Sequence, residues 1–116
     1  MEGEMDSILD SVKKLLGIPK EIDDYDIDVI MHINSVFFIL YQMGVGDKAY
    51  VLHDNTETWA DFFGDLKENE AVKMYVYYKV RILFDPPSSS FVLEAMNKAI
   101  QEYEFRINLD YDPRNP

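Results

Sequence analysis

The sequence predicts an all-α fold: a single small domain of four to five helices in a bundle, with a central strand-like loop and an extended C-terminal tail. Three observations predict it. Apolar residues recur at spacings of three and four in several segments, glycines or prolines end those segments, and 116 residues that are 47% hydrophobic suffice for one core. We therefore expect a helical domain over residues 1–109 and a tail over residues 110–116.

The first helix is expected over about residues 6–16. Asp6 or Ser7 can cap its beginning, and Gly17 followed by Pro19 ends it. Its apolar residues fall on one side of a helix, at i, i+1, i+4, i+7 and i+8. They are Ile8, Leu9, Val12, Leu15 and Leu16. The helix is therefore short and amphipathic.

A longer second helix is expected over about residues 26–43, before the glycines of residues 44–46. Carboxylates within residues 21–28 precede it and can interact favourably with the dipole at its N-terminus. Its apolar residues form two stripes, so we expect a central helix that is covered on two sides. The stripes are Ile30, Phe37 and Tyr41, and Val29, Ile33, Val36 and Leu40. Asn34 and Ser35 lie within this helix and should bond to a neighbouring helix or to carbonyls of their own helix.

Residues 47–58 carry turn formers around a short apolar run and predict a protruding loop, strand-like or folded as a small hairpin. Thr56 or Thr58 can then cap a short third helix that ends at Gly64. Three large aromatic residues should anchor this helix to the core. They are Trp59, Phe62 and Phe63.

The stretch from about Glu68 to Phe84 is apolar nearly all round, and its periodicity does not decide between helix and strand. β-Branched and aromatic residues favour a strand, whereas the length without a turn former favours a buried helix. We expect a helix.

The segment Phe84-Asp85-Pro86-Pro87-Ser88 is the clearest break in the chain, because two adjacent prolines cannot lie inside a helix. The serines that follow can cap a last helix over about residues 90–108, where apolar residues repeat at three and four. Two oppositely charged pairs four residues apart would support this helix. They are Glu94 with Lys98 and Glu102 with Arg106.

The charge and composition exclude several classes of protein. Asp and Glu number 22 against 11 Lys and Arg, and the net charge of -11 disfavours binding through phosphate contacts. The chain has no cysteine, which excludes disulfides and thiolate chemistry and suits a reducing compartment. The first residues are acidic, and no apolar run reaches the roughly 18 to 20 residues that span a bilayer. We expect a soluble cytoplasmic protein without a membrane partner.

Residues that could carry chemistry are few. Only His32 and His53 could act as bases near neutral pH, and no motif of a hydrolase, a metalloprotease or a nucleotide-binding loop surrounds them. Asp24, Asp26 and Asp28 have the spacing that begins a calcium loop, but the glycine and the final glutamate of that loop are absent. We therefore expect no enzyme, no cofactor and no metal site.

Segments distributed over residues 6 to about 109 together resemble a known family. The most specific is the helix that ends in Phe84-Asp85-Pro86-Pro87, followed by serine and a final helix. The others are Ser7-Ile8-Leu9 to Leu16-Gly17-Ile18, Ile33-Asn34 to Gln42-Met43-Gly44-Val45-Gly46, Trp59, Tyr78 to Leu83, and Glu102-Tyr103-Glu104-Phe105-Arg106. In this order they resemble the small head-tail connector proteins of tailed bacteriophages of siphovirus type.

The resemblance implies a structural adaptor at the head-tail interface of a virion, assembled in the host cytoplasm. Such an adaptor forms a ring of about twelve copies under the portal protein, a closed heterologous assembly. The ring extends the channel through which packaged DNA passes without specific binding. It also provides the platform for a stopper or tail completion protein.

The resemblance also implies three groups of site residues. The portal-binding segment would comprise Leu109, Asp110, Tyr111, Asp112, Pro113 and Arg114. The loop at the channel or at a subunit interface would contain Asp47, Lys48, Tyr50, His53 and Asp54. The structural motif shared with the family would be Phe84, Asp85, Pro86, Pro87 and Ser88.

The acidic composition is compatible with two other interpretations. Negative charge in a ring would repel phosphate and let the duplex slide, but it could also merely keep the monomer soluble. A rival function is an acidic DNA mimic that occupies the basic cleft of a host nucleic-acid-binding protein. A mimic should spread carboxylates along one face, whereas here many fall within residues 21–28 and 54–70, which favours the adaptor.

Overall fold

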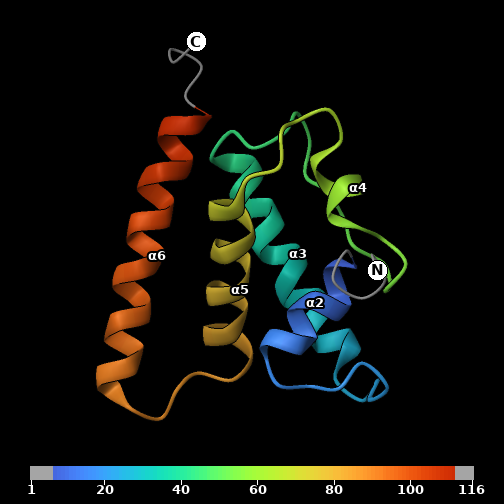
Figure 1. Ribbon diagram of the computed structural model, residues 1–116, viewed down its shortest axis with the longest axis vertical. Coiled ribbons are helices and arrows are strands. Elements are labelled where there is room, and N and C mark those ends of the chain that lie inside the picture. Colours follow the sequence, from blue (N-terminus) through green and yellow to red (C-terminus); the bar gives the residue numbers. More distant parts are fainter. Residues whose placement is uncertain (1–6, 112–116) are drawn as a thin grey trace.

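The computed structural model describes residues 7–111, and this part of the chain contains five helices and no strand (Figure 1). The helices are α2 (Ile8–Leu15), α3 (Asp26–Gln42), α4 (Trp59–Phe63), α5 (Glu70–Phe84) and α6 (Ser90–Asp110). The predicted all-α domain is confirmed. The segment whose periodicity left helix and strand open is helical from residue 70 to residue 84.

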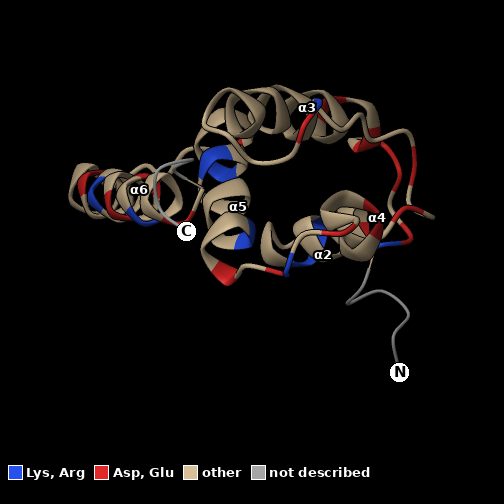
Figure 2. Cartoon of the chain, turned by 90° about the horizontal axis from the view of Figure 1, so that it is seen from above, with Lys and Arg blue, Asp and Glu red and all other residues tan. Residues whose placement is uncertain are grey.

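α5 is the central helix of the domain. It runs antiparallel to α3 and to α6, which pack against different sides of it (Figure 1). Viewed along the helices, α5 lies between α6 and the group formed by α2, α3 and α4 (Figure 2). Its four buried residues are Val72, Tyr75, Val76 and Val80. This covering on several sides explains why the sequence of α5 is apolar nearly all round.

α3 is covered on part of its surface only. Of the two predicted stripes, the one through Val29 and Ile33 is fully buried, and Phe37 of the other is buried as well. A third apolar row was not expected: Ile27 and Met31, on the far face, are 75% and 63% exposed. Sequence periodicity shows that a helix has apolar sides, but it does not show how many neighbouring helices exist to cover them.

α6 lies at the edge of the domain and packs against α5. Of its 21 residues only Ile100 and Ile107 are buried. The hydroxyl of the buried Tyr75 in α5 donates a hydrogen bond to Glu104 Oε2 at 3.1 Å. Burial, together with the charge and hydrogen bond of Glu104, raises the pKa of Tyr75 above its usual value. α6 is thus held along one side and leaves the rest of its surface open.

Side chains predicted to cap helices do so. Ser7 is the N-cap of α2, and its side chain accepts from the backbone N–H of Asp10. Thr58 rather than Thr56 caps α4, and Ser89 caps α6. These side chains satisfy N–H groups that the first turn of a helix leaves without a partner.

Lys13 is only 1% exposed, although lysine seldom lies so deep. Its Nζ donates to the carbonyl oxygens of Lys20 and Ile22 at 3.2 and 2.7 Å and pairs with Asp26 Oδ1 at 2.7 Å. These contacts join α2, the connection after it and the first residue of α3. A single buried cation therefore holds the first two helices together at this end.

The break between the last two helices contains the segment Phe84-Asp85-Pro86-Pro87-Ser88. The Phe84 ring ends α5 and makes edge contacts with the rings of Tyr25 and His32, at centroid distances of 5.7 and 6.3 Å. Arg81 Nε donates to the carbonyl oxygen of Asp85 at 2.7 Å. Pro86 and the residues that follow then lead the chain into α6, as predicted.

The last helix is longer than the expected range of residues 90–108. α6 includes Leu109 and Asp110, and Tyr111 is its C-cap and packs against the core, so the helical body reaches beyond residue 109. Asn69 Nδ2 donates to Asp110 Oδ2 at 2.8 Å, which ties this end to the start of α5. The sequence contains no helix stop near residue 108, and no local pattern indicates this long-range bond.

Only one of the two predicted charge pairs on the last helix is present. Arg106 pairs with Glu102 at 2.7 Å. Lys98 and Glu94 make no ion pair with each other in the described part of the chain. Surface pairs of this kind contribute little stability, so the helix does not depend on them.

Replacing the buried lysine tests how far the fold depends on it. We expect Lys13→Met to lower the free energy of unfolding by about 2–4 kcal/mol, because Asp26 and two carbonyl oxygens lose their donor. The urea midpoint should fall while the slope of the transition stays unchanged. The matched control Lys67→Met, at an exposed site, should change stability by less than about 0.5 kcal/mol. Equal midpoints for both variants would contradict the prediction.

Candidate functional site

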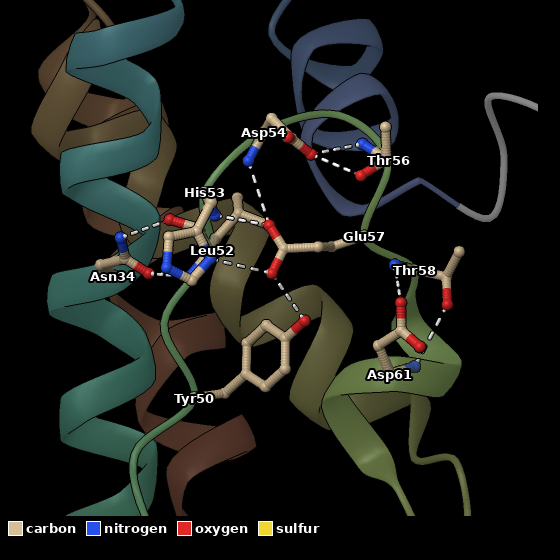
Figure 3. A network of polar contacts seen from close by, with 9 residues as sticks. All are labelled: Asn34, Tyr50, Leu52, His53, Asp54, Thr56, Glu57, Thr58 and Asp61. Atoms are coloured by element: carbon tan, nitrogen blue, oxygen red, sulfur yellow. Dashed lines mark hydrogen bonds and ion pairs between the residues drawn. The ribbon is translucent and has the colours of Figure 1, made fainter.

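The candidate site is the loop between α3 and α4, residues 43–58, which Asn34 of α3 holds at its middle (Figure 3). Asn34 Oδ1 accepts from the backbone N–H of Leu52 at 2.7 Å, and Asn34 Nδ2 donates to the Leu52 carbonyl at 3.0 Å. The Leu52 side chain is buried. One side chain thus satisfies both backbone groups of a buried residue, as a neighbouring strand would otherwise do.

Of the predictions for the two polar residues inside α3, one is confirmed and one is wrong. Ser35 Oγ donates to the carbonyl of His32 at 2.9 Å, which confirms a bond within its own helix. The prediction for Asn34 is wrong, because its partner is the loop and neither another helix nor its own carbonyls. The sequence indicated that Asn34 needed a partner, but the partner lies 18 residues away.

Glu57 is the centre of the hydrogen bonds within the loop (Figure 3). Its Oε1 accepts from the backbone N–H groups of His53 and Asp54. Its Oε2 accepts from the Tyr50 hydroxyl at 2.9 Å and lies 3.2 Å from His53 Nδ1. Burial by itself would raise the pKa of Glu57, but these hydrogen bonds outweigh it and lower the pKa to about 2. Glu57 is therefore a carboxylate whose acceptor positions are used by the loop itself.

Two further carboxylates order the chain on either side of Glu57. Asp54 Oδ1 accepts from the hydroxyl and the backbone N–H of Thr56 at 2.6 and 2.9 Å, which lowers the pKa of Asp54. Asp61 Oδ2 accepts from the Thr58 N–H at 2.9 Å, and Thr58 Oγ1 accepts from the Asp61 N–H at 3.1 Å. The second pair is a capping box, which fixes where α4 begins.

The end of the loop is joined to the start of α2. Ser7 Oγ donates to the carbonyl of Asn55 at 2.8 Å, and the Ile8 N–H donates to the carbonyl of Glu57 at 3.0 Å. Ser7 and Thr58 form an antiparallel bridge. The loop therefore forms a closed arch between α3, α2 and α4.

Aromatic rings cover the inner side of the arch. The Tyr50 ring makes edge contacts with Phe37 and Phe62, and these two rings stack with centroids 4.4 Å apart. Trp59 Nε1 donates to Ser11 Oγ at 3.2 Å. The predicted anchoring of α4 by its aromatic residues is confirmed. Burial and the nearby carboxylate of the arch also raise the pKa of the Tyr50 hydroxyl.

The structure brings together three of the five loop residues expected from the sequence. Tyr50, His53 and Asp54 all meet at the Glu57 carboxylate. Asp47 and Lys48 are exposed and line a surface hollow of about 600 Å³ between the start of the loop and α4, and Tyr50 lines it as well. Tyr50 therefore belongs both to the hollow and to the contacts around Glu57.

The expectation of a protruding loop needs correction. Val45 and Leu52 are buried in the core, and no strand or hairpin forms within residues 43–58. His53, whose side chain is 74% exposed, is presented from an anchored backbone. Glu57 was missed by sequence analysis, although a carboxylate three to four residues after a turn is well placed to accept its N–H groups.

The start of the loop also contacts the end of α6. Gly44 has φ +103, and a Cβ placed there would lie 3.2 Å from the Tyr111 carbonyl oxygen, so only glycine fits without strain. The last turn of α6, which holds Leu109 and Asp110 of the expected portal-binding segment, therefore ends beside the loop. Asp112, Pro113 and Arg114 of that segment lie outside the described residues.

One of the three carboxylates that the sequence raised as candidates for metal chemistry has another contact. Asp26, from the calcium-like spacing, pairs with Lys13. Within residues 7–111, no three His, Cys, Asp or Glu side chains are grouped so that they could hold a metal ion. Over the same residues, no helix has the length and apolar character needed to span a membrane.

Comparison with known proteins identifies a family. The family model described as Phage connector protein matches residues 8–114, a range that includes all five helices and the loop. Neither the curated proteins nor the solved structures contain a match.

The Glu57 contacts predict a pH-dependent stability. We expect Glu57→Gln to be less stable than the wild type at pH 7 by about 1–3 kcal/mol, because an amide accepts these hydrogen bonds less strongly than a carboxylate. Since the folded-state pKa lies below the usual 4.5, the advantage of the wild type is complete above about pH 4.5 and disappears as the pH falls through about 2.

Chemical denaturation at several pH values between 7 and 2 measures this difference. The control Glu94→Gln, at an exposed site on α6, should show no comparable difference from the wild type at any pH. A stability difference for Glu57→Gln that stays constant over the whole range would contradict the assigned role of the carboxylate.

Proposed function

Because the chain belongs to the phage connector protein family, we propose that it is a non-enzymatic adaptor that forms a ring under the portal protein of a virion. The ring extends the DNA channel and provides the platform for a stopper or tail completion protein. The observation that carries this proposal is the family match over residues 8–114. The ring, its partners and its place at the head-tail interface are part of the proposal.

The charge of the chain supports a channel that does not retain DNA. Residues 21–47 contain six carboxylates and neither Lys nor Arg. Acidic residues lie on the connections beside α3 and α4, whereas α6 carries both acidic and basic residues (Figure 2). A lumen with excess carboxylate repels phosphate, whereas a basic one would hold the duplex through counterion release. A duplex can therefore slide through such a ring.

The anchored loop suits a contact surface in this ring. Asn34 and Glu57 hold the backbone of residues 52–54 from inside, so His53 is presented from a backbone that needs little ordering on binding. Asp47 and Lys48, nearer the start of the loop, are exposed as well. We place these exposed residues at the channel or at a subunit interface. Anchoring by hydrogen bonds is more useful to a fixed ring contact than to a loop that must rearrange.

The end of α6 suits the contact with the portal. Leu109 is half-exposed, while Asp110 and Tyr111 are tied to Asn69 and to the core. We place the portal contact from Leu109 to Arg114, so that it starts on the rigid end of a helix. Before it meets the portal, the protein is then a monomer or a loose oligomer in the host cytoplasm.

The rival DNA mimic is less well supported. In the acidic segment 54–70, Asp54, Glu57 and Asp61 accept hydrogen bonds within the loop and the cap of α4. Carboxylates used in this way are positioned by local structure and not by a phosphate-like spacing along one face. The adaptor is therefore the proposal we adopt.

Mixing with the portal protein tests the function directly. We expect electron microscopy of the mixture to show one additional ring on the portal. Removal of residues 112–116 should lower portal binding while helix content, measured by circular dichroism, is unchanged. The exposed-site variant Lys67→Met serves as a control that keeps binding. A portal that gains no density from the wild-type protein would refute the adaptor.

A further inference from the structure

The outer face of α6 carries a row of exposed residues. Ile100 and Ile107, the buried residues of this helix, lie on the opposite side, toward α5. The exposed row is spaced alternately by four and three residues, which keeps it on one side of the helix over a rise of about 27 Å. We call it the outer row, and its members are Phe91, Ala95, Lys98, Glu102, Phe105 and Leu109.

The outer row is apolar toward both ends and charged in its middle. Phe91 is 81% exposed and Phe105 is 64% exposed, values that are high for aromatic residues of a packed domain. Lys98 makes no ion pair in the described part of the chain. Glu102 uses its Oε2 for Arg106, one turn further along α6. Both views place α6 at one edge of the domain, so a second molecule can approach it there (Figure 1, Figure 2).

The order of these residues makes the outer row complementary to itself in the antiparallel orientation. The spacing reads the same in both directions, so the first residue of one copy can face the last residue of the other, and so on along the row. Phe91 then faces Leu109, and the small Ala95 faces the large Phe105. In the middle, Lys98 of each copy faces Glu102 of the other copy. Two ion pairs thus lie between apolar layers, and each residue of the row has a suitable partner.

Other arrangements of the outer row lack this match. In a parallel pair each residue faces its own counterpart, so that Lys98 meets Lys98 and Glu102 meets Glu102, both repulsive contacts. The exposed face of α3 contains no cation that Glu102 could meet, because no Lys or Arg occurs in residues 21–47. The order of the charges therefore selects a second α6 and fixes its direction.

The charges that flank the outer row do not oppose the antiparallel pair. Glu94 flanks it on the same side of the helix as Gln101 and Asn108. A two-fold axis across the pair brings residues of the same side together, so Glu94 meets these neutral side chains of the second copy. Arg106 flanks the row on the other side, which it shares with Val92 and Ala99. No like charges are brought together by the pairing.

We propose that a second copy of this chain binds the outer row of α6 in the antiparallel orientation and forms a two-fold symmetric dimer of the free protein. The apolar layers supply the affinity, and the ion pairs fix the orientation, since a charge that is buried without its partner is costly. One pair of helices is a small contact, so the dimer is weak and forms as the protein concentration rises. Because the contact is isologous, association stops at two copies.

The dimer would regulate access to the portal, a step that rests on the proposed function. Leu109, the first residue of the proposed portal contact, lies against Phe91 of the second copy in this dimer. The portal and the second copy therefore compete for the same end of α6. An isologous contact cannot repeat around a ring, so the dimer separates before its chains join one.

Exchange of charges tests the pairing. Lys98→Glu places two carboxylates in each central layer, and Glu102→Lys places two cations there. Each variant alone should raise the dimer dissociation constant in sedimentation velocity by more than about tenfold, because like charges then face each other. An equimolar mixture of the two variants should dimerise again, since each central layer then holds one Glu and one Lys. The double variant Lys98→Glu/Glu102→Lys should dimerise by itself.

Controls separate the pairing from effects on the fold. Lys67→Glu, an equal change of charge at an exposed site outside α6, should associate like the wild type. Circular dichroism of every variant should match that of the wild type. Unchanged association of both single variants, or a mixture that does not dimerise, would overturn the dimer.

Introduced cysteines report the orientation, because the chain contains no cysteine of its own. Ala95→Cys mixed with Phe105→Cys should give a disulfide-linked dimer on mild oxidation, since these two positions face each other. Ala95→Cys alone should not be linked, because its two copies lie about 15 Å apart along an antiparallel pair. A disulfide formed by Ala95→Cys alone would contradict the antiparallel orientation.

The remaining outcomes separate the dimer from the proposed function. A wild-type protein that stays monomeric as its concentration rises toward the millimolar range overturns the dimer. If it stays monomeric and Phe105→Glu loses portal binding, the portal is the occupant of the outer row. The disulfide-linked dimer should add no ring to the portal in electron microscopy until it is reduced, and a ring formed by the linked dimer would refute the competition. The adaptor function fails only if the wild-type protein adds no ring.

Discussion

Burial of α5 on several sides positions the other helices of the domain. Val72, Tyr75, Val76 and Val80 have no exposed surface, and each such residue contributes about 1.5–3 kcal/mol through burial. α3 and α6 occupy different sides of this helix, with α2 and α4 beside α3. α6 lies at the edge of the domain and packs only with one side against α5, so the opposite face of α6 stays exposed.

Polar side chains also position the segments between the helices. Lys13 joins the first two helices, Asn34 holds the middle of the loop, and Glu57 gathers the N–H groups of the turn. Each uses a side chain to satisfy backbone groups that would otherwise cost free energy.

The two regions that we propose as contact surfaces in the ring lie next to each other in space, although they are far apart in the chain. Gly44, at the start of the loop, admits the carbonyl of Tyr111, and Asn69 holds Asp110 beside it. The end of α6 therefore lies close to the loop that Asn34 and Glu57 hold. The adaptor that we propose would work through such fixed surfaces.

Local signals were enough to predict the helices and most of their ends, because periodicity, caps and prolines act within a few residues. The break at Pro86 followed from such signals, whereas the helix at 70–84 was predicted from the length of a stretch without a turn former. The central place of α5, the burial of Lys13 and the anchoring of the loop by Asn34 and Glu57 came only from the packing of distant segments. A polar side chain's need for a partner can be read in the sequence, but the partner's identity depends on which segments the fold brings together.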